Sequence, residues 1–246
     1  MDEKNLKINK ILAEAFKNHQ RNNLKVAENL YKKILKINPD QFEAIFLLGS
    51  LSLQIKDFGT AVKLLNKAIK LKPDHVNANY NLSLTLTELK EFKEALPYCQ
   101  KAIEIDPNHL EAYNNLGNIF KELREFKKAK NCYKKAIHIQ PNFLKAYNNL
   151  GNILKELGEY SEAKNYYQEI IKIKPNHTKA HYNLALLFKV LGDFKSTKSS
   201  YEEVLKYKPE NLTALYELSN LKKEVLNENL KNKINKIIKD KKCTNE

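Results

Sequence analysis

Asparagine recurs at a fixed interval of the sequence, because Asn81, Asn115, Asn149 and Asn183 follow one another in steps of 34 residues. Asparagine makes up 30 of the 246 residues, so composition alone would give such a row with a chance of about two in ten thousand. A carboxamide carries a donor and an acceptor, and it can pair with a peptide N–H and a peptide C=O at once. The row therefore predicts recognition of the backbone of an extended polypeptide.

The same interval separates six prolines and divides most of the chain into equal repeats. The prolines are Pro39, Pro73, Pro107, Pro141, Pro175 and Pro209. With the proline as residue 32 of each unit, the repeats are 8–41, 42–75, 76–109, 110–143, 144–177 and 178–211. Residues 1–7 form a lead, 212–242 a half repeat and a capping helix, and 243–246 a tail. Such a period indicates a stack of one structural unit.

Each repeat predicts two amphipathic helices, as the repeat 110–143 illustrates. Apolar residues three and four positions apart run through 110–123 and again through 126–137. Position 8 of every repeat is small, whereas position 24 is tyrosine in four of the six repeats. We expect the small residues to let the helices approach closely.

A proline followed by Asp or Asn marks the end of each of the first five repeats. The pairs are Pro39–Asp40, Pro73–Asp74, Pro107–Asn108, Pro141–Asn142 and Pro175–Asn176. Proline cannot continue a helix, and Asp and Asn are good N-cap residues. The pairs therefore predict that proline ends one helix and that the Asp or Asn caps the next.

Residues 8–226 resemble the tetratricopeptide repeat family, with the Leu-Gly pair, the Ala-x-x-x-Tyr pattern and the terminal proline of that family in place. The departures are the absence of tryptophan at position 4, Glu14 where leucine is expected, and Thr197 where alanine is expected. The resemblance implies an all-α fold. It would be a right-handed superhelical solenoid of about six helical hairpins with a C-terminal capping helix.

The resemblance also implies that the first helix of each repeat lines a concave groove, with positions 2, 5, 6, 9, 12 and 13 facing it. The candidate peptide-binding residues are then Tyr80, Asn81, Asn114, Asn115, Asn118, Asn148, Asn149, Asn152, Lys179, Tyr182 and Asn183. The partner would be a protein or extended peptide. A second interpretation stays open, in which the asparagines hydrogen-bond neighbouring helices instead of a ligand.

A two-carboxylate clamp, which some members of the family use to bind the C-terminal acid of a chaperone, is incomplete here. Asn118, Asn149 and Lys179 stand at three of its positions. Asn114 and Asn183 replace two of its cations. Capture of a carboxylate loses much without the second cation, so this pattern argues against chaperone-tail binding.

The formal net charge of +14 raises the alternative of a basic nucleic-acid-binding surface. Against it, Arg21 and Arg124 are the only arginines, and the lysines are scattered among glutamates. The largest local excess, +5, falls in residues 221–242 without interleaved aromatic residues. This distribution favours weak attraction to acidic partners over reading of nucleic-acid bases.

The sequence shows no catalytic motif, so we expect a binding module rather than an enzyme, with no cofactor. It contains neither a phosphate-binding glycine loop nor a nucleophile elbow. Cys99, Cys132 and Cys243 lack Cys-x-x-Cys spacing, and the first two are expected to pack inside second helices. His75, His109 and His177 lie one or two repeats apart, which argues against a shared metal site.

The start and end of the chain complete the expectations. The charged opening and the absence of a long apolar segment predict a cytoplasmic protein without a membrane span. Residues 221–238 would cap the solenoid or pair two copies, giving a monomer or a weak homodimer. The chain also resembles the N-terminal repeats of bacterial O-linked N-acetylglucosaminyltransferase-like and sulfotransferase-linked proteins. It would then be the substrate-recognition arm of a larger peptide-modifying enzyme whose catalytic domain lies elsewhere.

Overall fold

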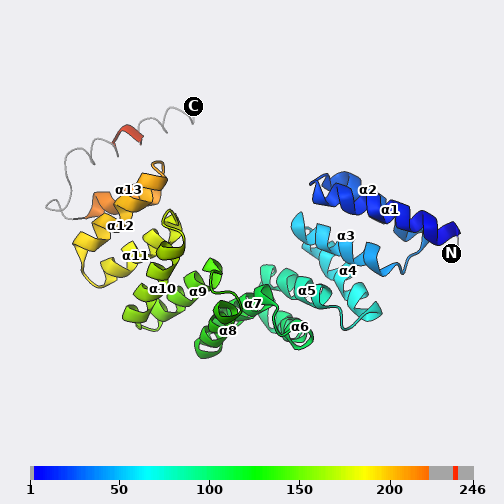
Figure 1. Ribbon diagram of the computed structural model, residues 1–246, viewed down its shortest axis with the longest axis horizontal. Coiled ribbons are helices and arrows are strands. Elements are labelled where there is room, and N and C mark those ends of the chain that lie inside the picture. Colours follow the sequence, from blue (N-terminus) through cyan, green and yellow to red (C-terminus); the bar gives the residue numbers. More distant parts are fainter. Residues whose placement is uncertain (1–2, 222–234, 238–246) are drawn as a thin grey trace. The chain divides into compact units, whose positions relative to one another are not determined.

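The computed structural model describes residues 3–221 and 235–237, which contain thirteen named α-helices and no strand. Figure 1 shows these helices following one another in pairs. Their bounds are α1 (Glu3–Gln20), α2 (Leu24–Ile37), α3 (Phe42–Gln54), α4 (Phe58–Leu71), α5 (Val76–Glu88), α6 (Phe92–Ile105), α7 (Leu110–Glu122), α8 (Phe126–Ile139), α9 (Leu144–Glu156), α10 (Tyr160–Ile173), α11 (Thr178–Val190), α12 (Phe194–Tyr207) and α13 (Leu212–Asn220). The expectation of an all-α helical solenoid is confirmed.

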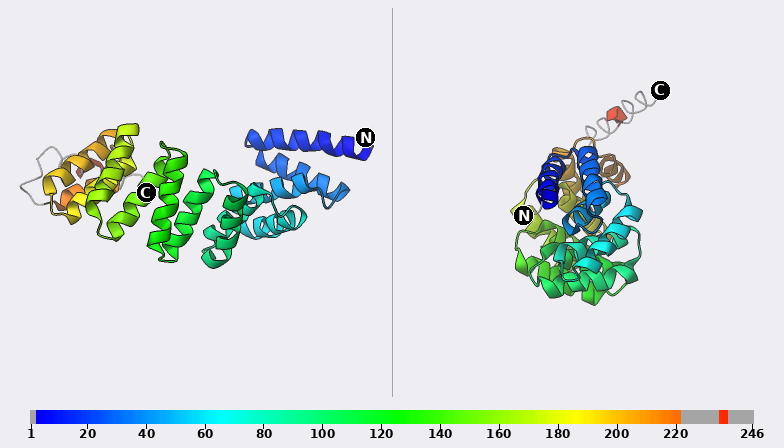
Figure 2. Two further views of the ribbon diagram at one scale, coloured as in Figure 1. Left: turned by 60° about the horizontal axis from the view of Figure 1, so that its bottom comes forward. Right: turned by 90° about the vertical axis from the view of Figure 1, so that its right-hand side faces the viewer.

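The helices form two compact units, residues 1–139 and 140–246, each built from antiparallel helix pairs. Within each unit a helix packs against the next helix along the chain. The first helix of a pair also contacts the first helix of the following pair, as α5 does with α7 and α9 with α11. The first helices of a unit therefore lie side by side, and Figure 2 shows the paired helices of each unit from two further directions.

Proline ends the second helix of a pair, as predicted, because the residue before it is forced out of the helical conformation. Lys174, which precedes Pro175, has φ −139° and ψ 89° and forms the C-cap of α10. Lys208 before Pro209 has nearly the same angles at the end of α12. A side chain on proline's neighbour clashes with the proline ring in the helical region, which explains the extended angles.

The predicted N-caps are wrong by one residue. The cap of α5 is His75, whose Nδ1 accepts the backbone N–H of Ala78 at 3.1 Å, rather than Asp74. His109 and His177 cap α7 and α11 in the same way. The Asp or Asn after proline lies in the turn that must reverse the chain before the helix begins, and Asp74 there pairs with Lys101 at 3.1 Å. The shift leaves Asp74 exposed for that ion pair.

The turn inside each of the six helix pairs contains one residue in the left-handed region. Asn22, Lys56, Lys90 and Arg124 have φ between 59° and 64° in residues 1–139. In residues 140–221 the same position is glycine, at Gly158 and Gly192. Only glycine adopts this conformation without a steric cost.

Small residues of the first helices face large residues of the second helices, as expected. A Cβ atom placed on Gly117 would lie 2.4 Å from Cε1 of the Tyr133 ring, and one on Gly151 would lie 2.5 Å from Cε1 of Tyr167. Tyr133 and Tyr167 are both fully buried. The pairing lets the helices of a hairpin pack around the tyrosine rings.

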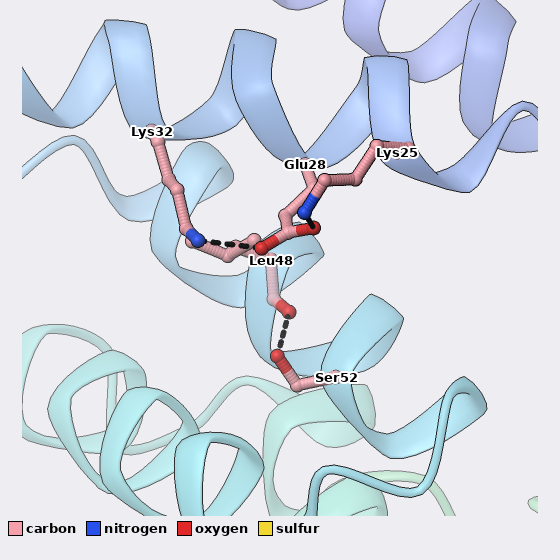
Figure 3. A network of polar contacts seen from close by, with 5 residues as sticks. All are labelled: Lys25, Glu28, Lys32, Leu48 and Ser52. Atoms are coloured by element: carbon pink, nitrogen blue, oxygen red, sulfur yellow. Dashed lines mark hydrogen bonds and ion pairs between the residues drawn. The ribbon is translucent and has the colours of Figure 1, made fainter.

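Some charged residues on the second helices form ion pairs with partners close in sequence. Figure 3 shows the carboxylate of Glu28 on α2 between Lys25 and Lys32, at 3.0 Å and 2.5 Å. These lysines lower the pKa of Glu28 through their hydrogen bonds. Below this network, the Ser52 hydroxyl donates to the carbonyl of Leu48 at 2.9 Å and so satisfies a buried polar group inside α3.

The predicted C-terminal half repeat begins with α13, and most of the predicted capping helix lies outside the described residues. Of that region the structure describes the helical residues 235–237, where Ile237 packs against a buried cluster that includes Tyr201, Leu215 and Leu218. None of the described helices has both the length and the apolar character that crossing a membrane requires. Cys243 also lies outside the described residues.

Candidate functional site

The candidate residues lie on first helices and fall into two groups, one in each unit. Tyr80 and Asn81 are on α5, and Asn114, Asn115 and Asn118 are on α7, all in residues 1–139. The second group comprises Asn148, Asn149 and Asn152 on α9 with Lys179, Tyr182 and Asn183 on α11. We use the term inner face for the side of a unit on which these residues lie. In residues 1–139 it is formed by α5 and α7, and in residues 140–221 by α9 and α11.

In residues 1–139 the asparagines of position 6 donate to the preceding first helix. The Nδ2 atom of Asn81 donates to Oγ of Ser50 at 2.9 Å, and Nδ2 of Asn115 donates to Oγ of Ser83 at 3.1 Å. Asn81 is half-buried, whereas Asn115 is only 3% exposed. These bonds tie α5 to α3 and α7 to α5.

In residues 140–221 two asparagines pair with each other. Nδ2 of Asn183 on α11 donates to Oδ1 of Asn148 on α9 at 2.7 Å. Asn183 is 7% exposed and Asn148 is 4% exposed. This is the contact between neighbouring helices that the sequence left open as the second interpretation. Asn114 and Asn149 are half-buried, and each takes part in an interaction of its own.

The asparagines of position 9 bind the buried tyrosines of the second helices. The Tyr133 hydroxyl donates to Oδ1 of Asn118 at 2.8 Å, and the Tyr167 hydroxyl donates to Oδ1 of Asn152 at 2.7 Å. Both asparagines are half-buried. Their carboxamides are therefore oriented by a rigid partner, which fixes the side on which each amide N–H lies.

The corresponding tyrosine of the last complete repeat has no such acceptor. Leu186 occupies the position of Asn118 and Asn152, and the buried hydroxyl of Tyr201 makes no hydrogen bond to any described residue. The Tyr201 ring instead meets Tyr182 edge-on at 5.7 Å. Burial raises the pKa of Tyr201 well above its usual value, with Glu217 and Tyr182 contributing.

The two candidate tyrosines pack against aromatic neighbours at the inner face. The Tyr80 ring lies 4.8 Å from that of His109, the N-cap of α7. Burial raises the pKa of Tyr80 to about 12, so this phenol is a neutral donor at physiological pH. Tyr182 similarly rests on Tyr201.

Cavities open beside candidate residues in both units. One of about 520 Å³ is lined by Asn118 with Lys121 and Glu122 of α7 and by Thr87, Glu88, Lys90 and Phe92. Another of about 380 Å³ in residues 140–221 is lined by Lys179 and Tyr182 among others. Both are open and polar, as suits a flexible chain rather than a deeply buried small molecule.

The described residues offer no cluster of three or more His, Cys, Asp or Glu that could hold a metal. Cys99 and Cys132 are buried in second helices, which confirms the packing interpretation. Burial raises the pKa of Cys99 to about 11 and that of Cys132 to about 12. These thiols are therefore poor nucleophiles.

Sequence reasoning missed the partners that fix the asparagines. Ser83 was expected only to be a small residue at position 8 that lets helices approach, and no role was predicted for Ser50. A usable signal was that the preceding first helix offers a polar side chain to Asn81, Asn115 and Asn183, namely Ser50, Ser83 and Asn148. Tyrosine at position 24 with asparagine at position 9 was a second usable pairing in the fourth and fifth repeats.

Comparison with known families matches the Tetratricopeptide repeat model at residues 110–143 and 144–177, and a second model of that name at 178–211. Residues 20–102 match the model described as Anaphase-promoting complex, cyclosome, subunit 3. No curated protein matches the sequence. The resemblance to transferase-linked repeats and the nucleic-acid alternative stay predictions.

Several solved structures share the fold. The crystal structure of MamA is 27% identical over 67% of this chain and 96% of MamA, with a TM-score of 0.62. PilF of Pseudomonas aeruginosa is 19% identical, covers 89% of this chain and 99% of its own, and has a TM-score of 0.74. YrrB, a tetratricopeptide repeat protein with an unusual peptide-binding site, is 19% identical over 76% of this chain and 96% of its own, with a TM-score of 0.61. Residues 110–211 of the chain are thus three tetratricopeptide repeats.

Proposed function

We propose that the chain is a protein-interaction scaffold and that the inner face of each unit binds an extended segment of another protein. The observation that carries the proposal is the orientation of the asparagines. Asn81, Asn115 and Asn183 each use Nδ2 for a neighbouring helix, and among the described contacts their Oδ1 atoms accept no hydrogen bond. Of the three, Asn81 is half-buried, and its remaining acceptor is the one that a peptide N–H can reach.

Asn152 supplies the complementary group. Its Oδ1 accepts from Tyr167, while its Nδ2 donates to no described residue. Asn81 in residues 1–139 thus offers an acceptor and Asn152 in residues 140–221 offers a donor, and a peptide backbone can pair with either group. Because a neighbour fixes each carboxamide, little side-chain entropy is lost on binding. The half-buried Asn81 and Asn152 are the more accessible contacts, and the nearly buried Asn115 and Asn183 chiefly set the spacing of the first helices.

Peptide selection provides the test. The immobilised chain serves as bait for a random phage-displayed peptide library, and the selected peptide is labelled for fluorescence anisotropy. Loss of one hydrogen bond costs about 1 kcal/mol, so Asn81→Ala should weaken binding of a peptide held by residues 1–139 about fivefold, and Asn152→Ala that of a peptide held by residues 140–221. Asn131→Ala and Asn165→Ala, on exposed positions of second helices, are matched controls that should bind like the parent chain.

A modified peptide tests whether the backbone is read. N-methylation of single peptide bonds removes an N–H that would donate to an asparagine Oδ1, and we expect it to weaken binding about fivefold or more at some positions and not at others. Equal affinity of every N-methylated peptide, or losses in both Asn81→Ala and Asn152→Ala no larger than those in the two control variants, would contradict the proposal. Far-ultraviolet circular dichroism of each variant shows that the helices remain.

A further inference from the structure

Two adjoining cavities in residues 140–221 are lined by lysines and lack a carboxylate. The first, of about 380 Å³, is lined by Thr178, Lys179, Tyr182, Lys208, Asn211 and Thr213. The second, of about 460 Å³, shares three of these residues and adds Lys174, Asn176, His177 and Tyr207. The shared residues join the two cavities into one basic pocket, which we call the lysine pocket.

The charges of the lysine pocket are unbalanced within the described part of the chain. Lys174, Lys179 and Lys208 form no ion pair there, although many other lysines do. The second repeat carries an ion pair at the corresponding place: Lys72, the counterpart of Lys208, pairs with Glu43 at 3.2 Å. Lys179 is the counterpart of Glu43. An ion pair in one repeat has thus become two like charges in another.

Hydrogen-bond donors accompany the positive charge. Helices α11 and α13 begin at Thr178 and Leu212, beside the pocket, and the first backbone N–H groups of a helix have no acceptor within it. Thr178 and Thr213 add hydroxyls. His177 uses Nδ1 to accept the N–H of Ala180, and burial with the charges of Lys174 and Lys179 lowers its pKa, so it is neutral near pH 7. Three cations with several N–H and O–H donors match an anion of more than one charge.

We propose that the lysine pocket binds a phosphate monoester dianion carried by a peptide on the inner face of residues 140–221. The link to a peptide is geometric, because Lys179 and Tyr182 line the pocket and also belong to the inner face. The assignment of the phosphate to a bound peptide rests on the proposed function, whereas the affinity of the pocket for a dianion does not. A single carboxylate leaves more of the charge of the three lysines unbalanced than a phosphate monoester does.

The first experiment titrates the full chain with inorganic phosphate and follows backbone amide signals by nuclear magnetic resonance. We expect saturable shifts at Thr178, Lys179 and Thr213. Lys174→Gln combined with Lys208→Gln should weaken phosphate binding about tenfold, because charge-assisted contacts are lost. Lys195→Gln combined with Lys134→Gln removes the same charge from exposed positions that do not line the pocket, and should change the affinity less than twofold.

The second experiment distinguishes a free anion from a peptide-borne one. The peptide selected by phage display is prepared with phosphoserine, serine or glutamate at each position in turn. We expect one phosphoserine position to bind at least about tenfold tighter than serine or glutamate there, with the gain lost at high salt and in the double variant of Lys174 and Lys208. The serine peptide should bind that variant as it binds the parent chain.

The outcomes separate the two proposals. Absence of saturable phosphate shifts, or equal affinity of the two double variants, overturns the lysine pocket even where the neutral peptide still binds. Equal affinity of the glutamate and phosphoserine peptides overturns the preference for a dianion. If phosphate causes saturable shifts of the amide signals but no peptide binds, the proposed function and the assignment of the phosphate to a peptide are both overturned. The lysine pocket is then a site for a free phosphate.

Discussion

A Cβ atom on Gly117 would lie 2.4 Å from Cε1 of Tyr133, a distance that real Cβ contacts do not show. The ring is fully buried and its hydroxyl is held by Asn118, so it has little freedom to move away. We expect Gly117→Ala to lower the free energy of unfolding by about 2–3 kcal/mol, as overpacking of a core does. Urea denaturation followed by circular dichroism measures this.

Gly59 provides the control for that substitution. It lies within α4, and a Cβ atom there would meet nothing within 4 Å. Alanine has the higher helix propensity, so Gly59→Ala should be neutral or raise the free energy of unfolding by up to about 1 kcal/mol. A similar loss in both variants would show that the Tyr133 ring is not the obstacle.

Two buried tyrosines should respond in opposite ways to removal of the hydroxyl. Tyr167→Phe loses the bond to Asn152 and should lower the free energy of unfolding by about 1 kcal/mol. Tyr201→Phe removes a buried hydroxyl that has no acceptor among the described residues and should raise it by about 1 kcal/mol. Leu186→Asn should supply the missing acceptor, and Tyr201→Phe should then become destabilising. Destabilisation by Tyr201→Phe in the parent chain would contradict this account.

The histidine N-caps make stability depend on pH. Burial, with Lys72 for His75 and with Lys174 and Lys179 for His177, lowers the pKa of both imidazoles below 6.5. The unfolded chain then binds protons more readily than the folded one, and stability rises with pH. The contribution of the two neutral histidine caps to the free energy of unfolding should be complete above about pH 6.5. It should decline as the pH falls through the lowered pKa values of the folded state.

Thermal melts between pH 8 and pH 5 measure this effect. His75→Asn combined with His177→Asn keeps a good N-cap but removes the titrating group, so the dependence of Tm on pH should become shallower between pH 6.5 and 5. Carboxylates titrate in the parent chain and in the double variant alike, so their effect on Tm cancels when the two are compared. An unchanged pH dependence would show that these caps do not contribute.

The left-handed residues of the hairpin turns predict an asymmetry between residues 1–139 and 140–221. Lys90 has φ 64°, which costs a residue with a Cβ atom about 1 kcal/mol, so Lys90→Gly should raise the free energy of unfolding by about 0.5–1 kcal/mol. Gly158 has φ 77° with open space around it, so Gly158→Ala should be destabilising through the backbone alone. The same sign for both substitutions in urea denaturation would refute the explanation.

The fold could be predicted from the sequence because its signals repeat. The prolines end the second helices in every pair, and the small residues at Gly117 and Gly151 face tyrosines as the period suggests. The N-caps could not be assigned correctly, since Asp74 and His75 are both capable of the role and the geometry of the turn decides between them. Asp is preferred over His at the N-cap position of helices, but Asp74 stands one residue too early in the chain to cap α5.

The candidate site was predictable in position but not in detail. The period places Asn115 and Asn183 on first helices, and the structure has them there. Their burial depends on what the preceding first helix offers, which is Ser83 for Asn115 and Asn148 for Asn183. Such a contact joins residues more than 30 positions apart, and helical periodicity along one segment carries no information about it.

Packing of each helix against its neighbours along the chain also bears on synthesis of the protein. In each unit the strong contacts join helices that are consecutive in the sequence, such as α5 with α6 and α11 with α12. Short-range contacts of this kind form quickly because little chain must be closed into a loop. A hairpin emerging from the ribosome can therefore be completed before the next one is translated, and a nascent chain exposes only one unfinished apolar face at a time.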